Sequence, residues 1–136
     1  MPADLIICLK KFNEKNQSNN REKIYKNLSF PLDGLCLSSK MRNKVVYSFH
    51  SASLHHGTDC QTGHFTSIRG KNGGLYYFDD ENSPSVLQFH SNRLKSSSVH
   101  FLMFKENFND YSFCDDQNKV VDDLDSILSK IGNFQL

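Results

Sequence analysis

The sequence lacks a long hydrophobic run, an excess of charge of either sign and closely paired cysteines. No apolar run approaches the roughly 18 residues that a membrane helix needs, and the start MPADLIICLKKF is unlike a signal peptide. Sixteen basic residues against 15 acidic ones give a net charge of +1, so bulk electrostatics indicates no nucleic acid and no anionic membrane as partner. We therefore expect a cytoplasmic or nuclear protein.

The four cysteines, Cys8, Cys36, Cys60 and Cys114, lie far apart and form no Cys-x-x-Cys pair. This spacing argues against a zinc ribbon and against a small disulfide scaffold, so we expect reduced thiols. Cys8 lies inside an apolar run, which predicts a buried side chain. With 136 residues, the chain fits one domain or a piece of one.

Six segments have patterns that are typical of strands: residues 5–9, 28–32, 45–56, 65–69, 75–78 and 99–104. The first is a continuous apolar run, which favours a strand at the centre of a sheet. Asn72, Gly73 and Gly74 accept positive φ values, so the fourth and fifth segments should form a hairpin. Residues 81–98 are polar with scattered apolar positions, which predicts a loop containing a helical turn.

The end of the chain has a helical pattern. Its apolar residues fall on one helical face: Val120, Val121, Leu124, Ile127, Leu128 and Ile131. Aspartates come early, Lys130 comes late, and Gly132 suits a stop. These features predict an amphipathic helix at about 118–131, within a C-terminal extension of residues 106–136. We expect this helix to pack on its own domain rather than on a partner.

His64 and Asp79 flank the predicted hairpin and should meet at the same end of it. A carboxylate bound to one imidazole nitrogen fixes the tautomer and supports the imidazolium that forms when the other nitrogen takes a proton. Gly63 has no side chain and would let a substrate backbone approach closely. The alternative is an ordinary solvated pair, which flanks many inert hairpins.

Six sequence blocks extend this observation. They are Leu-Lys-Lys-Phe ending at residue 12, Phe-Pro-Leu at 30–32, the strand 47–54 before His56-Gly57, Gly-His-Phe at 63–65, Tyr-Tyr-Phe-Asp-Asp at 76–80 and the strand 99–104. In this order they resemble the ubiquitin-specific protease family, the papain-like cysteine proteases that remove ubiquitin. The resemblance covers roughly residues 2–105.

The resemblance implies an α+β fold, the palm half of a papain-like cysteine protease, with an antiparallel sheet and few helices. Residues 1–105 would be the part of the catalytic domain that carries the histidine and the aspartate. His64 would be the general base, and Asp79 would orient it, with Asp80 as the alternative to Asp79. The substrate's tail would run past Gly63, Phe65 and His56. The partner would be ubiquitin or a ubiquitinated protein, with no metal or other cofactor.

The family's catalytic cysteine lies upstream of all six blocks. Cys60 is close to His64 in sequence, but it lies in the loop that leads into the histidine strand rather than across a cleft from it. We therefore expect no nucleophile in this chain. A cysteine-type deubiquitinase whose N-terminal half is missing, and which is inactive alone, is the main hypothesis. The alternative is a catalytically inactive module that binds ubiquitin or another protein.

A zinc site is a further alternative, because His55, His56, Cys60 and His64 lie within ten residues of one another. Neighbouring residues of a strand point to opposite faces, so His55 and His56 cannot both bind one ion without a bulge. We expect no metal site there.

Overall fold

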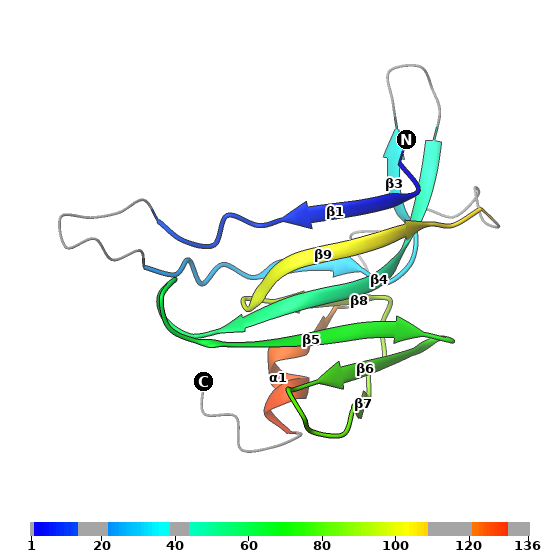
Figure 1. The fold of residues 1–136 in the computed structure, drawn as a ribbon. Helices are drawn as coiled ribbons and strands as arrows, with labels where there is room; N and C mark the ends of the chain where they lie inside the picture. The colour runs from blue at the N-terminus through cyan, green and yellow to red at the C-terminus, as the bar shows by residue number, and fades with distance from the viewer. Residues whose placement is uncertain (1, 14–21, 39–43, 109–120, 131–136) are drawn as a thin grey trace.

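The computed structural model describes residues 2–13, 22–38, 44–108 and 121–130, and within them it is mostly antiparallel sheet with one short helix (Figure 1). The elements are β1 (Asp4–Cys8), β2 (Leu28–Pro31), β3 (Leu35–Ser38), β4 (Lys44–His56), β5 (His64–Lys71), β6 (Gly74–Phe78), β7 (Ser85–Leu87), β8 (Arg93–Ser96), β9 (Val99–Glu106), β10 (Asp122–Asp123) and α1 (Leu124–Ser129). No helix of the described part is long and apolar enough to cross a bilayer.

Two sheets make up the fold. The larger has seven strands in the order β1-β9-β4-β5-β6-β7, with β3 beside the first part of β4. At 13 residues, β4 is long enough to pair with β3 near its start, with β9 along its middle and with β5 at its end. The smaller sheet has the order β10-β8-β2, in which β10 runs parallel to β8.

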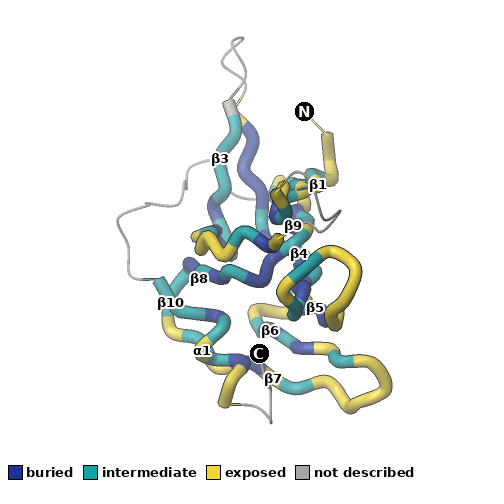
Figure 2. The backbone as a smooth tube through the Cα atoms, turned by 90° about the vertical axis from the view of Figure 1, so that its left-hand side faces the viewer, coloured by how far each residue is buried: buried dark blue, intermediate teal, exposed yellow. Residues whose placement is uncertain are grey.

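The core joins side chains from both sheets and from α1. The larger sheet contributes Tyr47, Leu54 and Ile68, the smaller sheet contributes Leu94, and α1 contributes Leu124, all fully buried. Burial of a large apolar side chain contributes roughly 1.5–3 kcal/mol. Figure 2 shows buried residues along the middle of the fold and exposed residues on the loops.

The hairpin of β5 and β6 is confirmed. Asn72 and Gly73 have φ values of 50° and 77°, and the ladder closes with Lys71 opposite Gly74. Positive φ at both central residues is the geometry of a type I′ turn, whose twist matches that of the two strands. The Asn-Gly pair therefore sets the register of this hairpin.

The predicted central position of the first strand is wrong. Strand β1 lies at the edge of the larger sheet and pairs with β9. Leu5 and Ile7 pack against the core, whereas Ile6 is 65% exposed. The predicted burial of Cys8 is wrong for the same reason, because its side chain is on the exposed side of β1.

The predicted helical turn within residues 81–98 is also wrong, since this segment forms β7 and β8. Both strands are short, with three and four residues, too few to show a period-two pattern. Leu87 and Leu94 are nevertheless buried in the core. These strands form because the core covers their apolar side chains, not because of a local sequence pattern.

Helix α1 is shorter than predicted, with six residues. Asp122 and Asp123 pair with β8 instead of starting the helix. As the N-cap, the Asp123 side chain accepts hydrogen bonds from the amides of Asp125 and Ser126. Residues 118–120 and 131 of the predicted range lie outside the described residues. The prediction that the helix packs on its own domain is confirmed, because Leu124 and Leu128 are buried.

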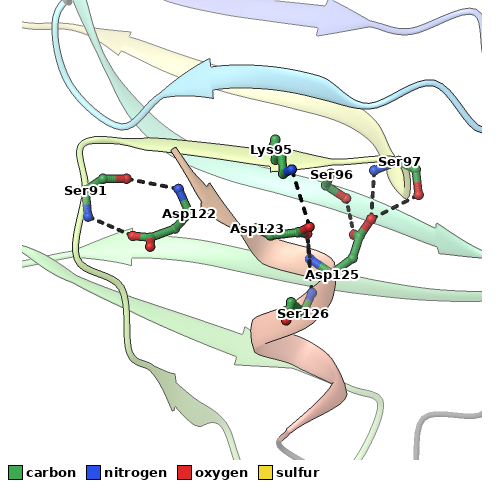
Figure 3. A network of polar contacts seen from close by, with 8 residues as sticks. All are labelled: Ser91, Lys95, Ser96, Ser97, Asp122, Asp123, Asp125 and Ser126. Atoms are coloured by element: carbon green, nitrogen blue, oxygen red, sulfur yellow. Dashed lines mark hydrogen bonds and ion pairs between the residues drawn. The ribbon is translucent and has the colours of Figure 1, made fainter. Parts of the chain in front are cut away.

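Polar contacts attach this C-terminal segment to the smaller sheet (Figure 3). Asp125 accepts hydrogen bonds from the Ser96 hydroxyl at 2.5 Å, the Ser97 amide at 2.9 Å and the Ser97 hydroxyl at 3.0 Å. Asp122 accepts one from the Ser91 amide at 2.7 Å, and its own amide donates to the Ser91 hydroxyl. The segment is therefore held by charge-assisted bonds as well as by apolar burial.

We predict that Asp125→Ala lowers the free energy of unfolding by about 1.5–3 kcal/mol, because hydrogen bonds to a charged group contribute that much. Urea unfolding followed by circular dichroism measures the change. Ser126→Ala is the matched control, since this exposed neighbour should change stability by less than about 0.5 kcal/mol. Equal stabilities of the Asp125→Ala and wild-type chains would contradict the prediction.

Candidate active site

The register of the β5–β6 hairpin brings His64 and Asp79 to one face of the larger sheet. The ladder ends with Ser67 opposite Phe78. Because side chains alternate between faces along a strand, Asp79 and His64 both point away from the face that carries Ser67 and Phe78. They are diagonal neighbours across the end of the hairpin, a separation that long side chains span.

The two side chains are in direct contact. His64 Nε2 lies 2.5 Å from Asp79 Oδ1 and 3.8 Å from Asp80 Oδ2. The His64 side chain is 44% exposed and that of Asp79 is 22% exposed, so the imidazole is open to an incoming group while the carboxylate is partly covered. A hydrogen bond from Nε2–H to Asp79 leaves the lone pair of Nδ1 free to take a proton.

Asp80 differs from Asp79 in position and backbone. Its φ is +45°, which is uncommon for a residue other than glycine. The chain therefore turns away from β6 directly after Asp79. Asp80 makes the longer of the two contacts with His64 and is 72% exposed.

Close packing against His55 and His56 requires a glycine at position 63. Its φ is +140°, and a Cβ there would collide with His55 Nε2 and come within 2.7 Å of the His56 carbonyl oxygen. A Cβ on Gly57 would come within 2.8 Å of the Gly63 Cα. The two glycines thus let the loop between β4 and β5 close tightly before His64.

His56 and Phe65 lie on opposite faces of the sheet beside His64. His56 pairs with His64 across the β4–β5 ladder, and its Nε2 is 2.7 Å from Thr66 Oγ1. Burial, together with the charges of Lys23 and His64, holds the pKa of His56 below its usual value. Phe65 is 55% exposed, and its ring centroid lies 4.8 Å from that of His55.

Tyr77 was not among the predicted site residues. It is buried on the same face as Asp79. Burial, together with the charge of Asp79, holds the pKa of Tyr77 above its usual value. Tyr77 lies two residues before Asp79, so the alternation of side chains along an extended chain could have indicated that both point to the same face.

The cysteines differ from expectation at one position. Cys36 is disulfide-bonded, so the prediction of reduced thiols is wrong there. Cys8 and Cys60 are free and exposed, and Cys114 lies outside the described residues. Spacing in the sequence could not reveal the disulfide, because such a bond depends on the distance between Cα atoms in the fold.

Cys60 lies in the loop between β4 and β5, as its sequence position suggested. Asp59 Oδ1 organises this loop by accepting hydrogen bonds from the Gln61 amide at 2.9 Å, the Thr62 amide at 2.7 Å and the Thr62 hydroxyl at 2.9 Å. The Cys60 side chain is exposed on this turn.

Within the part of the chain that the structure describes, His64, Asp79 and Asp80 form a group of potential metal ligands, whose ligand atoms lie within 4.8 Å of one another. This set differs from the histidine and cysteine cluster considered from the sequence. One imidazole and two carboxylates could hold a cation. The contact between Nε2 and Asp79 is already a complete hydrogen bond at 2.5 Å.

Comparisons with known proteins define the class. The chain is similar to solved structures of the yeast SAGA DUB module with an Sgf73 mutant, at a TM-score of 0.64 and 19% identity over 79% of this chain. It is also similar to a SAGA Ubp8 DUB module bound to ubiquitin aldehyde, at a TM-score of 0.62 and 19% identity over 79% of this chain. The fold is accordingly the papain-like α+β fold of these deubiquitinases.

The sequence comparisons give the family. A family model described as ubiquitin carboxyl-terminal hydrolase matches residues 1–104. "Ubiquitin carboxyl-terminal hydrolase 13" of Saccharomyces cerevisiae is 24% identical over 139 residues, which is 96% of this chain. The chain belongs to the ubiquitin carboxyl-terminal hydrolase family. It spans 18% of that relative and 25% of each of the two solved chains.

We predict that the folded state loses stability as pH falls from 7.5 to 5.5. Burial is the main cause that holds the pKa below its usual value in His50, His55, His56 and His100. Below pH 6.5 the unfolded chain therefore binds more protons than the folded chain, so the free energy of unfolding decreases. Urea unfolding at several pH values measures the slope.

His55→Phe tests the origin of this slope. The variant keeps an aromatic ring between Phe12 and Phe65, which both contact His55, and removes one titrating group. The pH dependence should become shallower. A slope that is flat in the wild-type chain, or that is unchanged by the substitution, would contradict the prediction.

Proposed function

We propose that this chain supplies the catalytic histidine and aspartate of a cysteine-type deubiquitinase, which hydrolyses peptide or isopeptide bonds at the ubiquitin C-terminus through a thiol. The observation that carries this proposal is the 2.5 Å contact between His64 Nε2 and Asp79 Oδ1. Membership of the ubiquitin carboxyl-terminal hydrolase family supports it. The binding of ubiquitin in similar solved structures supports ubiquitin as the partner.

In this proposal His64 is the general base and Asp79 orients it. Nδ1 of His64 takes the proton of a cysteine thiol, and the thiolate attacks the carbonyl carbon of the last ubiquitin residue. The imidazolium then protonates the leaving amine, and water hydrolyses the acyl-enzyme. Asp79 keeps the proton on Nε2 and stabilises the imidazolium. Asp80 is the alternative partner, at the longer distance of 3.8 Å.

The thiol in this proposal comes from a polypeptide segment outside this sequence. Cys36 is bonded in a disulfide, and Cys60 is exposed on the turn that Asp59 organises. The short share of its relatives that the chain spans supports a nucleophile elsewhere. Residues 1–105 would be the catalytic part, and residues 106–136 an extension.

The substrate tail in this proposal passes Gly63, Phe65 and His56. Phe65 offers an exposed ring next to the histidine, and Gly63 offers exposed backbone directly before it. His56 lies beside His64 on the ladder, where an uncharged imidazole adds no repulsion to a protonated His64. The setting would be cytoplasmic or nuclear.

We predict that the purified chain alone does not hydrolyse a fluorogenic substrate made from the ubiquitin C-terminus, because a base has no thiol to activate. Release of the fluorophore measures turnover, and a chelator excludes the contribution of contaminating metal. Turnover that survives the chelator and disappears in Cys60→Ser would show that Cys60 is the nucleophile and would contradict the prediction.

We predict that Asp79→Asn lowers kcat by about 10²–10⁴-fold when the thiol-bearing segment is supplied, because an amide no longer selects the correct tautomer. Asp80→Asn is the matched control and should lower kcat by less than about threefold, given its longer contact and exposure. Steady-state hydrolysis of the same substrate gives both values. Equal losses in the two variants would count against Asp79 as the orienting residue.

A non-catalytic ubiquitin-binding module is the second candidate. The outer face of the larger sheet favours it, because a shallow hollow there is lined by Ile6, Phe78, Phe101 and Met103. Exposed apolar surface of this kind often marks an interaction site. Saturable binding of labelled ubiquitin, without turnover after the thiol-bearing segment is added, would favour this candidate over the enzyme.

A further inference from the structure

Three hydrogen bonds join residues 22–25 to the end of β4 and to the loop that leads to His64. They run from Lys23 Nζ to the His55 carbonyl, from the Tyr25 hydroxyl to the Gly57 carbonyl at 3.2 Å, and from the Lys23 amide to the Thr58 carbonyl at 3.0 Å. Residues 22–25 are distant in sequence from the loop that they hold.

Lys23 supplies a hydrogen bond that the sheet cannot. The amide and the carbonyl of a strand residue point the same way, and the His55 amide donates to the Ser98 carbonyl at 2.8 Å. The β4–β9 ladder ends one residue earlier, with Leu54 opposite Val99. The His55 carbonyl therefore has no strand partner on that side, and a buried carbonyl needs a donor. The Lys23 amine, in a residue only 7% exposed, is that donor.

The His55 ring contacts the residues on both sides of His64. A Cβ on Gly63 would collide with its Nε2, and the Phe65 ring lies 4.8 Å from it. The position of the His55 ring therefore constrains the chain directly before and directly after His64.

We propose that Lys23 is a positioning residue for His64. Its amine binds the His55 carbonyl, and the His55 ring packs against Gly63 and Phe65. These two residues flank His64 and so determine where its imidazole meets Asp79. The catalytic meaning of this contact rests on the proposed function, in which His64 is the base. A displacement of about 1 Å in such a group can cost about 10²-fold in rate.

The test compares single variants of the full chain labelled with ¹⁵N-histidine. Long-range ¹⁵N–¹H spectra report the tautomer, and the hydrogen bond to Asp79 predicts the Nε2–H form for His64. Lys23→Met keeps roughly the length of the side chain and removes the hydrogen-bond donor. The single-tautomer pattern of His64 should therefore be lost. Lys23→Arg keeps a charged donor and should retain it. Lys26→Met removes an exposed lysine and is the matched control.

A second readout uses the hydrolysis assay with the thiol-bearing segment. Lys23→Met should lower kcat by about 10–100-fold and change KM by less than about twofold, because it misplaces the base without touching the substrate. A purely structural role would reduce the amount of folded enzyme and leave the tautomer of the folded fraction unchanged.

The proposal is overturned if Lys23→Met keeps the Nε2–H pattern of His64 while the backbone amide signal of His100, in β9, shows that the chain is folded. If Lys23→Met does not fold, Lys23→Gln replaces it, since this side chain is neutral and too short to reach the His55 carbonyl. Loss of the Nε2–H pattern of His64 in the folded variant then supports the proposal, and retention of the pattern overturns it. The spectra need no turnover. A lost pattern without any hydrolysis in the wild-type assay would therefore reject the proposed function and keep Lys23 as the residue that positions His64.

Discussion

The pairing register of β5 with β6 is the constraint on which the site depends. A shift of one residue would move every side chain of β6 to the other face of the sheet. Ile68 and Tyr77, which are paired and buried, oppose such a shift through the core, and the Asn72-Gly73 turn opposes it through its backbone geometry. The contact between an imidazole and a carboxylate is thus fixed by apolar packing and by a turn, both several residues away from it.

The connection between β4 and β5 faces a different problem, because it leaves the sheet just before His64. Where a ladder ends, backbone groups lose their strand partners but stay close to the core. Asp59 satisfies amides inside the loop, and residues 22–25 satisfy carbonyls at its start. Gly57 and Gly63 close the loop because no Cβ separates them. Polar contacts, rather than apolar burial, therefore determine how the chain enters β5.

The parts of this fold that could be predicted from the sequence are those with local signals. The long strands show period-two patterns, and the Asn-Gly pair marks the hairpin, so the approach of His64 to Asp79 follows from spacing. Strands β7, β8 and β10 have no such signal, since they have two to four residues and depend on tertiary packing. The edge position of β1 depends on which strand it pairs with, which its own residues do not specify. Lys23 could not be predicted either, because its acceptor is a backbone carbonyl 32 residues away.

Charge links the C-terminal segment to the same region of the fold. Burial holds the pKa of Lys11 and of Lys23 below the usual value, the charge of Lys11 lowers that of Lys23 further, and the charge of Asp125 opposes both shifts in part. Asp125 belongs to α1, beyond the residues that the family model matches, and its oxygens are bound by Ser96 and Ser97. A carboxylate held in this way is a fixed negative charge near two buried amines, which favours their charged forms. Docking of α1 on the smaller sheet therefore favours the charged form of Lys23, the residue whose amine binds the His55 carbonyl.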